Sequence, residues 1–314
     1  MDAQRELTRR QVAKLIGGAA TGLLLPIGAS RTAAADETTA MLARAIPSSG
    51  EKLPVIGLGT WQTFDVGSST AERAPLSQVL SLLVKSGGRV VDSSPMYGRS
   101  EEVIGDLAKA SQLESKLFLA TKVWTHGREA GIESMERSFA RFKTGRIDLM
   151  QVHNLVDVGT HLQTMRDLWS QGRFRYIGVT HYNESAYPEL EKVLRSEKLD
   201  FVQINYSIDE READQTILPL AQDKGIAVMI NRPFGGGDLF SRVRSKPLPE
   251  WATEFDCHSW AQFLLKWIIA HPAVTCAIPA TNNPEHMQDN LAAGVGRLPD
   301  QKTRKRMVDY VGLL

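Results

Sequence analysis

The stretch "VVDSSPMYG", residues 90–98, ends an apolar run with the carboxylate of Asp92 and adds the phenol of Tyr97 five residues later. Two later apolar runs have the same form. "LFLATKV" (117–123) carries Lys122 near its end, and "IDLMQVH" (147–153) ends at His153. Polar side chains at the ends of successive strands come together at the C-terminal mouth of a parallel β-barrel. This pattern therefore predicts both a fold and the place of a site.

Short, nearly continuous apolar runs recur along the chain, and strands buried on both faces of a parallel sheet look like this. The runs span residues 55–61, 88–94, 117–123, 147–153, 175–181, 199–205, 226–232 and 273–279. Segments of helical spacing separate them, such as residues 76–88, which place apolar side chains on one stripe before a Gly-Gly stop.

Eight alternations of strand and helix predict an α/β protein with a (β/α)8 (TIM) barrel as its single domain. A doubly wound open sheet is the alternative. It favours a G-x-G-x-x-G turn between the first strand and a helix, whereas "GLGTWQ" (57–62) lacks the third glycine and precedes a polar loop.

The N-terminus has the order of an export signal. Arg9 and Arg10 precede an apolar stretch at 15–29 and small residues at 33–35. The arginine pair indicates the twin-arginine (Tat) machinery as a partner. The stretch is shorter than the roughly 20 residues that span a bilayer, although an uncleaved anchor is the alternative. We expect a signal peptide at 1–35, a short linker at 36–50, a barrel at 51–314, and a periplasmic or otherwise exported protein with no stable membrane insertion after cleavage.

Composition narrows the partners. The 314 residues carry a formal net charge of +1, which offers no electrostatic attraction for nucleic acid. No C-x-x-C, H-E-x-x-H or His/Cys cluster occurs, so no metal site is predicted. Export would permit a disulfide between Cys257 and Cys276, but the strand-like surroundings of Cys276 favour a buried free thiol.

The four polar groups make chemical sense together. Reduction of a carbonyl leaves negative charge on oxygen, and a phenol such as Tyr97 can protonate it. The ammonium of Lys122 favours the phenolate and is expected to lower the pKa of Tyr97. Asp92 can hold Lys122 in place, and His153 can orient the carbonyl oxygen or relay a proton.

The sequence resembles the aldo/keto reductase superfamily over nearly all of residues 51–314. The matching motifs are "GLGTWQ", "VVDSSPMYG", "ATKVW", "QVHN", "YIGVTHYN", "VQINYS", "RPFGGG" and "IPATNNPEHMQDN". The resemblance implies reduction of a small aldehyde or ketone to an alcohol by hydride transfer from NADPH or NADH. It makes Asp92, Tyr97, Lys122 and His153 the catalytic residues.

The resemblance also implies a set of cofactor-binding residues. Thr180, His181 and Gln203 should meet the nicotinamide carboxamide, and Asp289 and Asn290 should lie near the adenine. The other expected cofactor-binding residues are Thr60, Trp61, Tyr206, Arg232, Pro233, Phe234, Gly235, Gly237, Thr281 and His286.

The sequence departs from the family's pattern in three respects. Thr180-His181 stands where Ser-Asn is common. Asn231 replaces a tyrosine that stacks on the nicotinamide, which leaves Tyr206 as a candidate for that contact. Ala280 and His286 stand where cations usually grip the 2′-phosphate of NADP, so the choice between NADPH and NADH is left open. The glycine run 235–237 is either a mobile loop over the pyrophosphate or a plain turn.

Two other functions are compatible with a barrel. One is a non-catalytic nicotinamide-binding or regulatory protein. The other is an aldolase that forms a Schiff base on Lys122, which leaves Asp92 and Tyr97 without an evident role.

Overall fold

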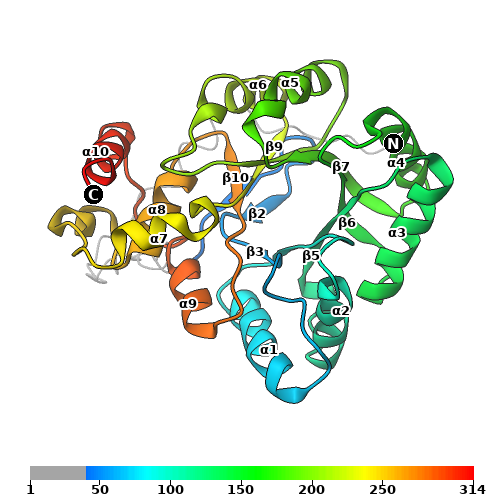
Figure 1. The fold of residues 1–314 in the computed structure, drawn as a ribbon, viewed down its shortest axis with the longest axis horizontal. Helices are drawn as coiled ribbons and strands as arrows, with labels where there is room; N and C mark the ends of the chain where they lie inside the picture. The colour runs from blue at the N-terminus through cyan, green and yellow to red at the C-terminus, as the bar shows by residue number, and fades with distance from the viewer. Residues whose placement is uncertain (1–39) are drawn as a thin grey trace, which may run out of the picture. The chain divides into compact units, whose positions relative to one another are not determined.

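Eight parallel strands form the central sheet of the computed structural model, which describes residues 40–314 (Figure 1). Neighbours in sequence are neighbours in the sheet, and isolated bridges Ile56–Ala277 and Gly59–Ala280 join its two edges into a closed barrel. The predicted TIM barrel is confirmed, with one strand in each predicted run. The strands are β3 (Leu58–Gly59), β4 (Val90–Asp92), β5 (Phe118–Val123), β6 (Ile147–His153), β7 (Phe174–His181), β8 (Phe201–Asn205), β9 (Ala227–Asn231) and β10 (Val274–Ala277).

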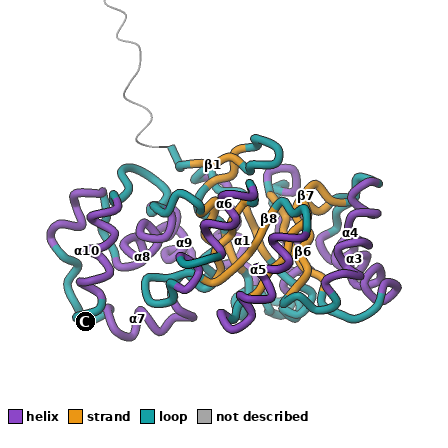
Figure 2. The backbone as a smooth tube through the Cα atoms, turned by 90° about the horizontal axis from the view of Figure 1, so that it is seen from above, coloured by secondary structure: helices purple, strands orange, loops and turns teal. Residues whose placement is uncertain are grey.

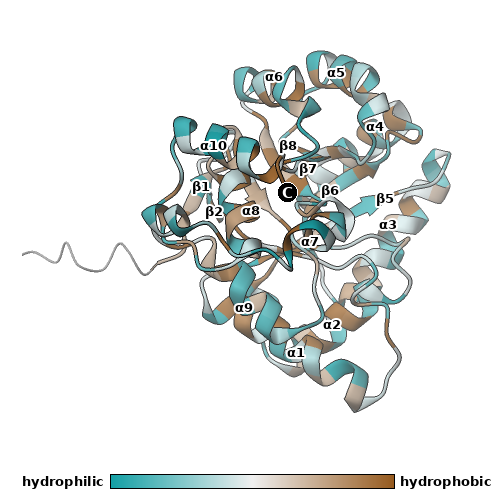
Figure 3. Ribbon diagram, turned by 60° about the vertical axis from the view of Figure 1, so that its left-hand side comes forward, coloured by the Kyte–Doolittle hydropathy of each residue, from teal (hydrophilic) through white to brown (hydrophobic). Residues whose placement is uncertain are grey.

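Helices surround the strands, because each helix has one apolar face that must be buried (Figure 1). Figure 3 shows strand β8 in brown, whereas α5 and α6 are mostly teal and white. The helices are α1 (Thr70–Lys85), α2 (Ser100–Ala110), α3 (Arg128–Phe142), α4 (Val158–Ser170), α5 (Tyr187–Ser196), α6 (Ile217–Lys224), α7 (Asp238–Val243), α8 (Trp260–Ile269), α9 (Pro284–Ala292) and α10 (Gln301–Val311). Short 3-10 helices are η2 (Glu114–Lys116), η3 (Glu184–Ala186), η4 (Glu212–Asp214), η5 (Gly235–Gly237) and η6 (Glu250–Phe255).

An antiparallel hairpin precedes the barrel and lies across one end of it (Figure 2). It pairs β1 (Ala43–Ala45) with β2 (Lys52–Pro54). Ile46 and Leu53 belong to the apolar cluster that fills the barrel interior. The residues predicted as a short linker, 36–50, therefore include strand β1 and part of the hairpin turn. Three residues with little periodicity gain their structure from pairing and burial, which sequence spacing does not reveal.

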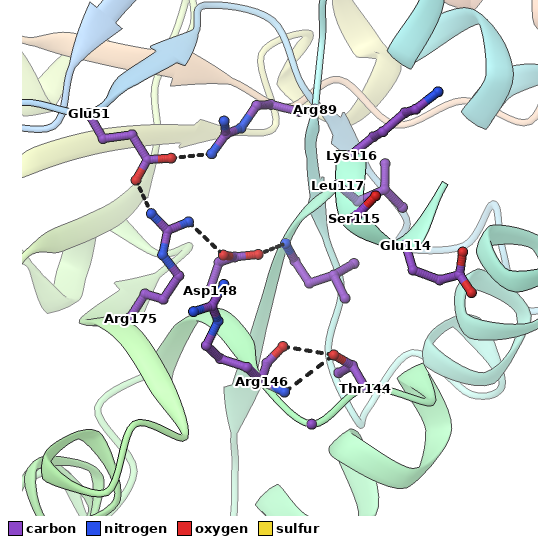
Figure 4. A pocket seen from close by; sticks show the side chains of 12 residues that line it. Glu51, Arg89, Glu114, Ser115, Lys116, Leu117, Thr144, Arg146, Asp148 and Arg175 are labelled. Atoms are coloured by element: carbon purple, nitrogen blue, oxygen red, sulfur yellow. Dashed lines mark hydrogen bonds and ion pairs between the residues drawn. The ribbon is translucent and has the colours of Figure 1, made fainter. Parts of the chain in front are cut away.

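The N-terminal ends of the strands are tied together by a charged network around a pocket of about 740 Å³ (Figure 4). The carboxylate of Glu51 pairs with Arg89 and Arg175 and accepts a hydrogen bond of 2.7 Å from the Tyr176 hydroxyl. Arg175 in turn pairs with Asp148 at 2.8 Å. Glu51 and Asp148 are thus already matched by cations, so we interpret this end as a structural clamp.

Both cysteines are buried free thiols, and no disulfide joins them. Cys276 lies in the barrel interior, as its strand-like surroundings indicated, whereas Cys257 belongs to the layer between strands and helices. Within residues 40–314 no helix is long and apolar enough to cross a membrane. The predicted signal at 1–35 lies outside the described residues.

Candidate active site

A pocket of about 910 Å³ opens at the C-terminal ends of the strands. The four predicted catalytic side chains all line it, namely Asp92, Tyr97, Lys122 and His153. They come from β4, the turn after β4, β5 and β6. These consecutive strands are neighbours in the barrel, and their C-terminal ends lie at the same end of it. Residues up to about 60 positions apart in the sequence therefore line one pocket.

Lys122 and Asp92 form the buried ion pair of the site. The ammonium Nζ donates to Asp92 Oδ2 at 2.6 Å and to the Ser93 carbonyl at 2.7 Å, and Gln151 donates to the other carboxylate oxygen at 3.2 Å. Burial alone would lower the pKa of Lys122, but the Asp92 carboxylate, together with Tyr97, outweighs burial and holds that pKa above its ordinary value. Lys122 is therefore a fixed cation. A Schiff-base aldolase needs a neutral amine, so this geometry disfavours that alternative.

Tyr97 sits in the turn after β4, where its backbone N–H donates to the Ser94 carbonyl at 3.0 Å. Its ring centroid lies 5.1 Å from the Lys122 ammonium and 6.2 Å from the His153 ring, edge to face. Burial raises the pKa of the Tyr97 phenol and outweighs the opposing influence of Lys122. The expectation of a lowered pKa is therefore wrong, because desolvation of the phenolate costs more than the nearby charge returns. The phenol is protonated at neutral pH, as a proton donor must be.

His153 ends β6 and is almost fully buried. Burial, with a smaller effect of the Lys122 charge, lowers the pKa of His153 to about 3. The ring is therefore neutral at physiological pH and can donate one hydrogen bond. Its Nδ1 lies 3.3 Å from Ser94 Oγ.

Three amide side chains in the pocket carry unmatched acceptors. The buried carbonyl oxygens of Asn154, Gln203 and Asn231 have no hydrogen-bond partner among the described residues. A buried acceptor without a donor costs about 1–3 kcal/mol, so such groups point to a missing ligand with N–H groups. The carboxamide of a nicotinamide ring offers such donors. The residues present thus fit the cofactor that the motifs imply.

The glycine run after β9 forms a tight turn beside the pocket. Gly235, Gly236 and Gly237 all have positive φ, at 59°, 72° and 108°, which glycine adopts at no steric cost. A Cβ at Gly236 would lie 3.0 Å from an Arg232 guanidinium nitrogen, so that side chain lies against the turn. Arg232 lines the pocket and has no ion pair within residues 40–314, which suits a pyrophosphate.

Not every predicted cofactor residue reaches this pocket. Those that line it are Thr60, Trp61, Thr180, Gln203, Arg232, Pro233, Phe234 and Gly237. Those that do not are His181, Tyr206, Gly235, Thr281, His286, Asp289 and Asn290. The last four lie after β10 or on α9, where the predicted contacts of Asp289 and Asn290 with the adenine, and of Thr281 and His286 with the cofactor, stay predictions.

Tyr206 differs most clearly from its predicted role as a residue that stacks on the nicotinamide. Its ring is fully buried and packs 4.9 Å from the Trp267 ring centroid, and its hydroxyl donates to Asp214 at 2.7 Å. Arg304 donates to the same hydroxyl at 2.9 Å. Tyr206 is thus held in the shell outside the barrel and cannot stack on a ring in the pocket.

Several pocket residues were missing from the predicted set. Met96, Trp124 and Tyr182 are exposed large apolar side chains at the mouth, together with the predicted Trp61. Asn154 directly follows His153, and Trp124 follows Lys122 by two positions, so the place at a strand end was the signal that could have found them.

Comparison with known proteins places the chain in a family. The Aldo/keto reductase family model matches residues 55–306, and the chain therefore belongs to this family. It is 28% identical to the methylglyoxal reductase YeaE of Escherichia coli, over 80% of this chain and 89% of that protein. It is 29% identical to the aldo-keto reductase YhdN of Bacillus subtilis, over 77% and 86%.

Solved structures agree. The thermostable aldo-keto reductase Tm1743, determined with the inhibitor epalrestat, is 26% identical, with a TM-score of 0.70 over 87% of this chain and 100% of that one. An aldo/keto reductase from Klebsiella pneumoniae in complex with NADP and acetate has the same fold, with a TM-score of 0.68 over 83% and 93% at 24% identity. The protein is an NAD(P)H-dependent oxidoreductase that reduces carbonyl compounds.

Proposed function

We propose that Tyr97 is the proton donor of this carbonyl reduction and that Lys122, held by Asp92, stabilises the phenolate that Tyr97 becomes. The observation that carries the proposal is the ion pair of 2.6 Å between Lys122 and Asp92, with Tyr97 and His153 on the same pocket wall. The bound cofactor supplies a hydride to the carbonyl carbon. As that bond forms, the carbonyl π pair moves onto oxygen and takes the Tyr97 proton, which yields the alcohol.

His153 acts beside Tyr97 in this proposal. A neutral imidazole on the same wall can donate a hydrogen bond to the carbonyl oxygen, and this bond strengthens as charge develops there. Gln203 and Asn231 would receive the nicotinamide carboxamide, and Arg232 with the glycine turn would hold the pyrophosphate. Each of these groups is already positioned by a strand or a tight turn, so little ordering is required on binding.

The mouth of the pocket favours small apolar carbonyl substrates. Trp61, Met96, Trp124 and Tyr182 expose about half of their surface there, and no charged side chain other than Arg232 and the buried catalytic groups lines it among the described residues. The name of the relative YeaE makes methylglyoxal one useful probe, and the aromatic rim makes an aromatic aldehyde another.

The test is turnover of both aldehydes with NADPH and NADH by the parent and by Tyr97→Phe. The variant should bind cofactor normally and lose at least about 100-fold in kcat, because it lacks the proton donor. Tyr310→Phe is the matched control, since Tyr310 lies outside the pocket and its hydroxyl has no hydrogen-bond partner in the described part of the chain. A Tyr97→Phe rate within about threefold of the parent would refute the role.

We also propose that residues 1–35 are a twin-arginine signal and that the mature protein works in the periplasm or beyond. The support is the order Arg9-Arg10, apolar stretch, small residues. The twin-arginine route carries folded proteins, so the barrel would bind its cofactor before export. Changing Arg9 and Arg10 to Lys should hold the precursor in the cytoplasm, as cell fractionation would reveal, whereas Arg5→Lys should be exported. Normal export of the Arg9 and Arg10 variant would rule out the signal.

A further inference from the structure

Two buried polar side chains meet behind the catalytic wall. Ser94 is 0% exposed and lies in the turn after β4, and His153 is 8% exposed at the end of β6. Ser94 Oγ lies 3.3 Å from His153 Nδ1. Ser94 does not line the pocket, and His153 is the one catalytic side chain that its hydroxyl contacts among the described residues.

The protons of this contact can be assigned by counting. A serine hydroxyl has one proton and can accept two hydrogen bonds. Ser94 Oγ accepts the Met96 backbone N–H at 3.3 Å, and within residues 40–314 the only acceptor recorded for its own proton is His153 Nδ1. If Nδ1 carried a proton instead, the buried hydroxyl proton would have no acceptor, which is unfavourable for a buried donor. Ser94 is therefore the donor and Nδ1 the acceptor.

This assignment decides which nitrogen of the imidazole carries the proton. The groups that act on the ring are Lys122, Tyr97 and His181, and burial together with the Lys122 charge keeps His153 neutral, with its pKa at about 3. A neutral imidazole has a single N–H, so an accepting Nδ1 places it on Nε2. Nε2 has no partner recorded among the described residues, and the ring lines the pocket.

We propose that Ser94 is a positioning residue that locks His153 in the Nε2–H tautomer, so that the imidazole donates its hydrogen bond to the substrate's carbonyl oxygen. The role of this N–H as a donor to the carbonyl oxygen rests on the proposed function, whereas the tautomer itself does not. Without the hydroxyl the two tautomers would be closer in free energy, and the Nδ1–H form would present a lone pair to an oxygen that is gaining negative charge. The loss should appear in kcat more than in KM, because that charge develops in the transition state.

The experiment reads the tautomer directly. The full chain is labelled with 15N-histidine, and two-bond N–H correlations in the holoenzyme distinguish Nε2–H from Nδ1–H, with His153 assigned by its absence in His153→Gln. The parent should show Nε2–H at His153. Ser94→Ala should show a mixture and lose about tenfold in kcat with KM within about threefold, the effect of one hydrogen bond. Ser94→Thr keeps the hydroxyl and should restore both readouts.

Ser100→Ala is the matched control. Ser100 is equally buried, and its hydroxyl has no partner in the described part of the chain, so neither readout should change. An Nδ1–H signal in the parent, or an unchanged tautomer in Ser94→Ala, would overturn the proposal. If Ser94→Ala does not fold, the parent spectrum alone decides. A parent that shows Nε2–H but reduces no carbonyl would contradict the proposed function and leave the tautomer assignment intact.

Discussion

The Lys122 ammonium lies 2.6 Å from the Asp92 carboxylate, and the two side chains are 2% and 4% exposed. Lys122 also donates to the Ser93 carbonyl at 2.7 Å, which uses a second of the three ammonium protons. The third ammonium proton remains for the side that faces Tyr97, whose ring centroid lies 5.1 Å from Lys122 Nζ. The carboxylate thus fixes the cation where a phenolate would form. A buried pair of this kind contributes little net stability, so we attribute its presence to catalysis.

Lys122→Met should lose about as much kcat as Tyr97→Phe, at least about 100-fold, because the phenolate loses its counter-charge. The double variant should be little worse than either single one, since groups that act as a unit are non-additive. Steady-state kinetics on the four proteins measures this. Lys266→Met is the control, because Lys266 is a buried lysine whose partners within residues 40–314 are the Val295 and Arg297 carbonyls, outside the pocket. Fully multiplicative losses would show that Tyr97 and Lys122 act independently.

His153 should make the protein less stable in acid. The pKa of His153 lies at about 3 in the folded protein against an ordinary 6.5, with burial as the main cause. Between pH 6.5 and pH 3, His153 is protonated in the unfolded chain but stays neutral in the folded protein. The free energy of unfolding therefore falls as pH drops from 6.5 toward 3. His153→Gln removes this contribution. Urea unfolding between pH 7 and pH 4 should show the variant losing less stability than the parent, and parallel curves would contradict the assignment.

The barrel and its catalytic wall could be predicted because both depend on local pattern. All six residues of β5 are buried, so the strand reads as one apolar run with Lys122 near its end. That Tyr206 packs outside the barrel, and does not face the pocket, could not be predicted. Its position is set by contacts with Trp267 and Arg304, which lie far along the chain. Depth of burial was also hidden, and it is this depth that reverses the expected pKa shift of Tyr97.

Glu51 should stabilise the barrel from the end opposite to the catalytic groups. Glu51→Gln leaves the Arg89 and Arg175 guanidinium groups facing a neutral side chain, so we expect a loss of about 1–2 kcal/mol in the free energy of unfolding with kcat unchanged. Glu102→Gln is the control, because its pair with Arg99 is exposed, with both side chains 44% accessible, and should change stability by less than about 0.5 kcal/mol. Equal effects of the two variants would show that the clamp contributes no more than an ordinary surface pair.

We expect this protein to have only a weak preference for NADPH over NADH. Ala280 and His286 supply no fixed cation at the expected 2′-phosphate position, and both are exposed. Arg242, a further cation on α7, is already paired with Asp209 and donates to the Val311 carbonyl at 3.0 Å. NADPH should therefore bind less than about tenfold more tightly than NADH, a difference of at most about 1.4 kcal/mol.

Binding isotherms with both cofactors on two variants locate the phosphate contacts. His286→Arg should strengthen NADPH binding alone, because a guanidinium offers a bidentate phosphate contact. Arg232→Ala should weaken NADPH and NADH equally, because Arg232 lies beside the glycine turn, where it would contact the pyrophosphate that both cofactors share. A hundredfold preference for NADPH in the parent that disappears in Arg232→Ala would place the 2′-phosphate, and not the pyrophosphate, at Arg232.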